Sequence, residues 1–262
     1  MRDFTRGLNI IGLLLFMFCE HVCAASNLAA LTPLPVWVDV FIVDDLSLNK
    51  KQQIMSSWVD TQDIRNTVLP EINRIWAPAA VYFKVRYVAA IASHPHPQKT
   101  ALLEAIVRSK RDASGHSDPE RIRKYNKLLN YPIAETLPAH GVVDYSGESV
   151  ISVFLVPYLG ETSQGNAKRK KRRIIVGQWT DKPSKGALPA QRLPLIEAQP
   201  MNVGSIARTM AHELGHILGL AHPDKKRQTQ FGLLMGGRRA GYDLTQQEIR
   251  MARQAASQLN AR

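Results

Sequence analysis

Residues 212–222 read His-Glu-Leu-Gly-His-Ile-Leu-Gly-Leu-Ala-His, and this segment constrains the fold more than any other. Asn202 or Ser205 is available to cap a helix before it. Apolar residues recur at helical spacing up to and through the segment, at Val203, Ile206, Ala207, Met210, Leu214 and Ile217. The segment is therefore expected on a helix, with His212 and His216 projecting from one face because they lie four residues apart.

Gly219 offers a way to end this helix, because glycine adopts the left-handed backbone conformation without a side-chain penalty. A turn there would bring His222 back toward His212 and His216, and three histidines can hold a tetrahedral Zn²⁺ with one position left for water. Glu213 would accept a proton from that water as it attacks a peptide carbonyl. A bare H-E-x-x-H is also compatible with an ordinary helical pair, and Gly219 and His222 are what favour the zinc site.

The pattern H-E-x-x-H-x-x-G-x-x-H resembles the zinc signature of metzincin metallopeptidases, in which a methionine turn follows. Residues 232–236, GLLMG, resemble that turn. The resemblance implies that Met235 lies beneath the zinc histidines as a hydrophobic floor, whereas a methionine that only fills the core is the alternative. Residues 202–253 are most similar to matrixin-like members, including bacterial ones. The resemblance implies a zinc metalloendopeptidase that acts on protein or peptide substrates.

Several positions depart from the family patterns. No cysteine follows Cys23, so latency through a propeptide cysteine is excluded. Gly237 stands where astacin-like and serralysin-like relatives carry a zinc-reaching tyrosine, and Tyr242 is too displaced to take that role. Pro223 and Asp224 follow the third histidine, which leaves the subfamily open. Asp224 either bonds a ligand histidine or, more commonly for an aspartate after proline, caps a turn.

Hydrophobic periodicity elsewhere predicts a mixed α/β (α+β) fold. Strands are predicted at 36–43, 81–88, 150–156 and 174–176, and helices at 64–76 and 245–259. Pro70 is expected to start or kink the first helix. In the second strand, Val81, Phe83, Val85 and Tyr87 are expected to share one face. The family resemblance implies a zincin-like fold: a twisted mixed sheet with a backing helix and an active-site helix, and a small C-terminal subdomain with the methionine turn and a terminal helix.

Residues 1–24 have the layout of a secretory signal peptide, with Arg2 and Arg6 before an apolar run at 8–18 and cleavage expected near Ala24. The apolar run is shorter than the roughly 20 residues that span a bilayer, so no permanent membrane span is expected. A secreted or periplasmic location is the consequence.

Residues 25–262 are expected to form a single catalytic domain. Its upper subdomain is predicted over about 34–220, with a polar insertion at about 92–147, and its lower subdomain over about 221–262. No internal repeat or Gly/Ser linker divides this part of the chain.

The chain is strongly basic, with a formal charge of +12. Six consecutive basic residues at 168–173 are interpreted as a loop. This loop binds an acidic or anionic surface, is itself cut by a trypsin-like protease, or is an ordinary solvated loop. Further positive charge at 225–227 and 238–239 suggests that the rim of the cleft prefers acidic or phosphorylated material. No specific nucleic-acid motif is present.

Two alternatives to an endopeptidase stay open at this point. The same zinc chemistry could act on the peptide crosslinks of a cell-wall polymer, which the shape of the cleft would decide. The second alternative is a basic binding module in which the zinc is purely structural. Glu213 argues against it, because a structural site needs no base and usually fills its fourth position with a protein ligand.

Overall fold

The structure is a computed structural model that describes residues 31–44, 48–50, 53–92, 150–159, 164–180, 199–201, 203–223, 232–236 and 241–261. Leu34–Arg262 belongs to one compact unit. The predicted signal peptide and, except for Ala92, the predicted polar insertion lie outside the described residues. Within the described ranges, no helix has both the length and the apolar character that crossing a membrane requires.

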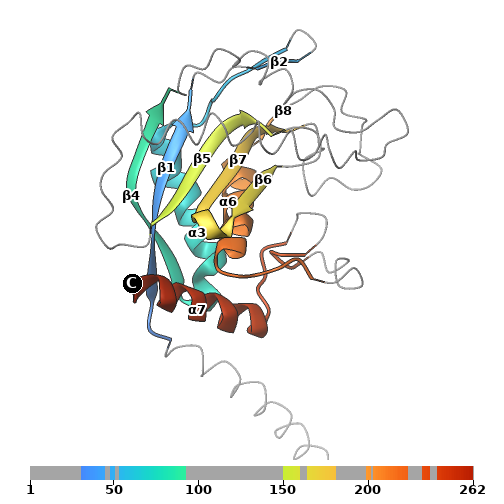
Figure 1. Ribbon diagram of the computed structural model, residues 1–262. Helices are drawn as coiled ribbons and strands as arrows, with labels where there is room; N and C mark the ends of the chain where they lie inside the picture. Colours follow the sequence, from blue (N-terminus) through green and yellow to red (C-terminus); the bar gives the residue numbers. More distant parts are fainter. Residues whose placement is uncertain are drawn as a thin grey trace, which may run out of the picture. The chain divides into compact units, whose positions relative to one another are not determined.

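A six-stranded mixed sheet forms the centre of this unit (Figure 1). Its main path runs in the order β4 (Val81–Ile91), β1 (Leu34–Val43), β5 (Ile151–Tyr158), β7 (Arg173–Thr180) and β6 (Gly165–Lys168). The first four are parallel, and β6 is an antiparallel edge strand. A short strand, β8 (Gln199–Pro200), pairs with the end of β7, while β2 (Leu48–Lys50) and β3 (Gln53–Met55) form a separate hairpin. The predicted mixed α/β class is confirmed.

The central strands β1 and β5 are largely apolar on both faces because both of their faces are buried. In β1, Val38 and Val40 belong to the main core between the sheet and the helices. Phe41 points to the other face, where it stacks on Phe154 of β5 with ring centroids 5.1 Å apart. The predicted strands at 36–43 and 150–156 are confirmed, each with slightly different ends.

Strand β4 follows the predicted alternation only as far as Val85. Its register with β1 shifts so that Val85 pairs with Val38 and Tyr87 pairs with Asp39, which leaves Arg86 as the extra residue of a bulge. Arg86 donates bonds of 3.1 and 2.7 Å to the buried carboxylate of Asp39. The bulge reverses the alternation, so the prediction that Tyr87 shares the core-facing side was wrong, and its side chain is 47% exposed.

The predicted loop at 168–173 is the turn of a tight hairpin, and only its two end residues belong to strands. Lys168 ends β6, a 3₁₀ turn η3 (Arg169–Lys171) follows, and Arg173 begins β7 opposite Lys168. Glycine, asparagine and lysine are uncommon in strands, so the sequence of β6 does not by itself indicate a strand. These residues form a strand because they pair with β7.

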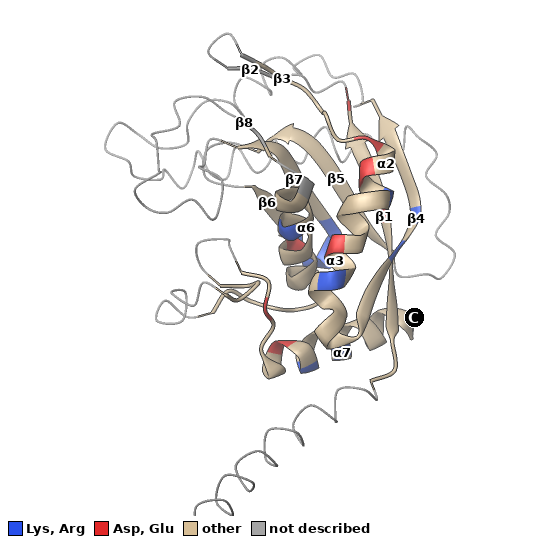
Figure 2. Cartoon of the chain, turned by 180° about the vertical axis from the view of Figure 1, so that it is seen from behind, with Lys and Arg blue, Asp and Glu red and all other residues tan. Residues whose placement is uncertain are grey.

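One face of the sheet is covered by helices, seen in front of the sheet in Figure 2. The first helical segment runs from α2 (Thr61–Asp63) through a π-turn η1 (Ile64–Val68) into α3 (Leu69–Trp76) and a 3₁₀ turn η2 (Ala77–Ala79). Pro70 lies in the first turn of α3 and has no N–H to continue a regular α-helix from the preceding residues, which accounts for the wider turn before it. The predicted start or kink at Pro70 is confirmed.

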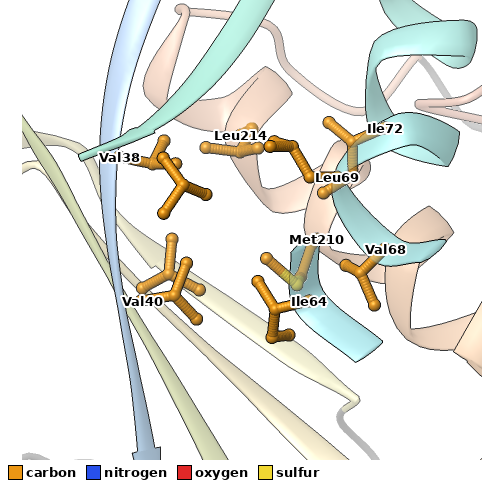
Figure 3. A pocket seen from close by; sticks show the side chains of 10 residues that line it. Val38, Val40, Ile64, Val68, Leu69, Ile72, Met210 and Leu214 are labelled. Carbon is orange, nitrogen blue, oxygen red and sulfur yellow. The ribbon is translucent and has the colours of Figure 1, made fainter. Parts of the chain in front are cut away.

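The second covering helix is α6 (Val203–Ile217), which packs against α3 and against strands β6 and β7. A small cavity remains between β1, the π-turn and α6 (Figure 3). Its lining is entirely hydrophobic and includes Val38, Ile64, Ile72, Met210 and Leu214. Water or a polar ligand would find no hydrogen-bond partner there, so this cavity is a packing gap in the core.

The chain closes with α7 (Gln246–Asn260), and the predicted helix at 245–259 is confirmed. Thr245 and Glu248 form a reciprocal capping box, with bonds of 3.2 and 2.7 Å between side chains and backbone N–H groups. Arg253 donates a bond of 2.8 Å to the carbonyl of Ala79. This contact fixes α7 to the end of the first helical segment.

Candidate metal centre

Helix α6 and the turn after it bring His212, His216 and His222 together. Their ligand nitrogens all lie within 4.8 Å of one another, and the Nε2 atoms of His216 and His222 are 3.1 Å apart. Two nitrogens on one tetrahedral Zn²⁺ are roughly 3.3 Å apart. The spacing therefore suits a single metal ion held by three imidazoles.

The convergence depends on the turn at Gly219, which has a φ of 89°. Its N–H donates to the carbonyl of His216 over 3.1 Å, and the N–H of Leu220 donates to Gly215 over 2.9 Å. These bonds end the helix and reverse the chain, so that His222 returns to the face that carries the other two histidines. A residue with a β-carbon would be strained at this φ.

Two of the rings are fixed through their Nδ1 atoms. Nδ1 of His212 lies 2.8 Å from the carbonyl oxygen of Leu234, and Nδ1 of His216 lies 2.8 Å from that of Leu220. A carbonyl only accepts hydrogen bonds, so each Nδ1 carries the proton and each Nε2 keeps its lone pair. These rings are thus oriented and in the tautomer that a metal ion requires.

Burial lowers the pKa of His212 to about 3, although the bond to Leu234 opposes this shift. The neighbouring histidines and the positive charge of Arg208 lower this pKa further. His212 is 9% exposed, whereas His222 is exposed, so the site opens to solvent on the side of His222. The buried imidazole is neutral at physiological pH and available as a ligand.

Met235 is fully buried and lies against α6 between the first two histidines. A β-carbon on Gly215 would lie only 2.8 Å from its sulfur atom, so a larger residue there would force this buried side chain to shift. The turn that carries Met235 is held by the N–H of Leu234, which donates to Asp243 over 2.8 Å. The structure thus places Met235 directly against the helix that bears His212 and His216.

Glu213 is 7% exposed and lies beside the edge strand β6. A β-carbon on Gly165 would lie 2.6 Å from Cγ of Glu213, so the strand passes over this side chain with room for hydrogen alone. Figures 1 and 2 both place β6 beside α6. Gly165 was not predicted as a site residue, because its role depends on a strand that the sequence does not indicate.

Arg208 is a second residue that was not predicted. It is 3% exposed and donates bonds of 3.0 Å to the carbonyl of Leu234 and 2.9 Å to that of Gly241. The carbonyl of Leu234 therefore receives bonds from both Arg208 and His212. A signal existed, since Arg208 is a charged residue four positions before His212 and therefore on the same face of the predicted helix.

Other predicted features have varied outcomes. The ring of Tyr242 lies against the guanidinium of Arg74, 5.6 Å from ring centroid to Cζ, and is 41% exposed. Asn202, Asp224 and Gly237 lie outside the described residues, as do the basic residues at 225–227 and 238–239.

Comparisons with known proteins provide little beyond this geometry. No protein-family model matches the chain, and no curated protein matches its sequence. Among solved structures, the chain is similar to a zinc-dependent peptidase from Methanocorpusculum labreanum (strain Z). The two are 13% identical over 82% of this chain and 99% of the other, with a TM-score of 0.38. A likeness of this degree does not determine function, so the histidine geometry carries the proposal that follows.

Proposed function

We propose that this protein is a zinc-dependent metalloendopeptidase of the metzincin type, with matrixin-like features around its metal centre. The observation that carries the proposal is the convergence of His212, His216 and His222, two of them fixed with Nε2 available. Glu213 lies next in sequence to the first histidine and beside the open edge of the sheet. This combination supports catalysis more than structural metal binding, which would not need a carboxylate next to the first ligand.

The residues divide the chemistry among them. A Zn²⁺ held by the three histidines would polarise the scissile carbonyl and lower the pKa of a bound water. Glu213 accepts a proton from the attacking water and then delivers it to the leaving amine. The buried backbone around Met235 keeps His212 in place while charge develops at the reacting carbonyl.

The edge strand β6 offers a place for the substrate main chain. The N–H of Gly177 donates to Gln164 over 2.9 Å, so residues 164, 166 and 168 of this antiparallel ladder bond to β7. The alternation directs the N–H and C=O of Ala167 away from β7, toward the open edge. An extended peptide can pair there, close to Glu213.

Cleavage of a diverse peptide library by the purified, zinc-loaded protein tests this proposal. Wild-type protein should cleave peptides, a zinc chelator should abolish cleavage, and Glu213→Ala should be inactive while still binding zinc. Glu71→Ala removes a surface carboxylate paired with Arg74 and serves as the matched control, with unchanged cleavage expected. Stoichiometric zinc without chelator-sensitive cleavage would instead support a binding module. Activity confined to crosslinked cell-wall peptides would support the second hydrolase function.

We further propose that residues 1–24 direct export and are removed. Mass spectrometry of the protein recovered from its producing cell tests this, and a mature chain beginning near Ala25 is the expected result. A mature chain that retains residues 1–24 would contradict it.

A further inference from the structure

The residues from Lys168 to Arg172, here called the basic turn, form a concentrated group of positive charge between β6 and β7. Arg169, Lys170 and Lys171 are exposed. Within the ranges that the structure describes, no side chain of the basic turn takes part in an ion pair. Like charges this close repel one another, so the cluster is costly unless an anion neutralises it.

The backbone of the basic turn also departs from ordinary turn chemistry. Arg172 has a φ of 44°, a left-handed conformation that glycine or asparagine adopts at lower cost. Its N–H closes the turn by donating to the carbonyl of Arg169 over 3.0 Å. The chain thus keeps an arginine where the conformation favours another residue. The stability of the turn does not explain this arginine, so we attribute it to a function of its positive charge.

Arg169 connects the basic turn to the metal centre. One of its terminal guanidinium nitrogens lies 3.1 Å from the position that a β-carbon on Gly219 would occupy. Gly219 is the turn residue between His216 and His222. The guanidinium therefore lies beside the end of α6, three residues before the exposed third histidine.

The direction of β6 gives the basic turn a defined place along a substrate. Gly165, at the start of the strand, lies beside Glu213, and Arg169, just after its end, lies beside Gly219. A peptide that pairs antiparallel with β6, the more stable arrangement, runs in the opposite direction. Its residues on the amino-terminal side of the scissile bond then approach the basic turn, about 13 Å along the strand from the level of Glu213.

We propose that the basic turn is a binding subsite for an acidic side chain of the substrate, two to four residues before the scissile bond. The inference rests on the proposed peptidase function and names its substrate class as peptides with aspartate or glutamate at those positions. A carboxylate matches the planar fork of an arginine guanidinium, and Lys170 and Lys171 add attraction from exposed positions.

The test compares two matched peptides around a cleavage site mapped with the library. One carries Glu at positions two to four before the scissile bond, and the other carries Gln. At low salt, the wild-type kcat/KM for the Glu peptide should exceed that for the Gln peptide by about tenfold, as expected for several partly exposed charge contacts. The ratio should fall toward one in 0.5 M salt, because salt screens exposed charges.

Variants locate the effect. Arg169→Gln/Lys170→Gln/Lys171→Gln should lower the ratio to less than about twofold, and Lys170→Gln/Lys171→Gln, which keeps the contact with Gly219, should give an intermediate ratio. Arg65→Gln/Arg250→Gln removes exposed charge from other surfaces and should keep the wild-type ratio. A ratio that survives in the triple variant would overturn the proposal.

Other outcomes are equally decisive. Cleavage of both peptides at equal rates by the wild type would overturn the subsite while leaving the peptidase function intact. A second outcome is a wild type that shows no preference between the peptides but binds polyphosphate, with that binding lost in the triple variant. In that case the basic turn binds a polyanion, and the proposed subsite is overturned. If Arg169→Gln lowers the thermal stability but leaves the ratio of kcat/KM between the two peptides unchanged, Arg169 only stabilises the end of α6, which also overturns the proposal. Absence of chelator-sensitive cleavage would overturn both proposals.

Discussion

The carbonyl oxygen of Leu234 lies 2.8 Å from Nδ1 of His212, so the turn that contains Met235 also orients the first histidine of the metal centre. Arg208 donates to the same oxygen over 3.0 Å and to Gly241 over 2.9 Å. Both described segments that flank residues 237–240 are thereby attached to α6. The orientation of His212 depends on contacts from three separate parts of the chain.

Arg208→Met should weaken zinc binding by about tenfold to a hundredfold, a typical effect of losing a group that supports a metal ligand. The substitution leaves two buried carbonyls with fewer donors and allows Leu234 to move relative to His212. Competition with a chromophoric chelator measures the zinc dissociation constant. Arg253→Met is the matched control, because Arg253 also donates to a carbonyl, that of Ala79, but away from the histidines. An equal loss of zinc affinity in both variants would reveal a general loss of stability.

Gly165→Ala should lower kcat by at least about tenfold while zinc stays bound, because the new methyl group would meet the side chain of Glu213 and displace it. Steady-state kinetics and zinc content are the measurements. Asn166→Ala, on the same strand but on its opposite face, should keep a kcat close to that of the wild type. Full activity in Gly165→Ala would show that Glu213 does not need its present position.

The metal-free protein should lose stability as the pH falls below 6.5, the ordinary pKa of histidine. His212 has a pKa of about 3 in the folded state, so between about pH 3 and 6.5 the unfolded chain binds a proton there that the folded chain does not. The unfolded state gains from this proton, and above pH 6.5 neither state carries it. Urea denaturation with chelator present, from pH 4.5 to 7.5, measures the dependence. His212→Asn should show a shallower decline, and an identical decline would contradict the assignment to His212.

The sequence indicated α6, the turn at Gly219 and the three histidines because these features depend on spacing within a short segment. It also indicated the sheet and α7, where apolar periodicity is strong. Strand β6 could not be foreseen, since Gly165, Asn166 and Lys168 form a strand only through pairing with β7. The reversal at Tyr87 likewise follows from a bulge that Arg86 makes to reach Asp39, a residue 47 positions earlier.

The candidate site shows the same division between local and distant information. The ligands and Glu213 lie within one segment, and their spacing predicts their chemistry. Contacts of Glu213 with Gly165, and of His212 with Leu234, join elements that lie far apart in the chain. Such contacts leave no periodic signal, and only the folded arrangement reveals them.

The turnover of Glu213→Gln at full zinc occupancy tests the central claim most directly. The substitution preserves the size and shape of the side chain but removes its ability to accept a proton. The account predicts one zinc ion per chain in both proteins and a kcat for the variant about 10²- to 10⁴-fold below that of the wild type, the usual range for loss of a general base. A zinc-loaded Glu213→Gln protein that cleaves peptides at the wild-type rate would contradict it.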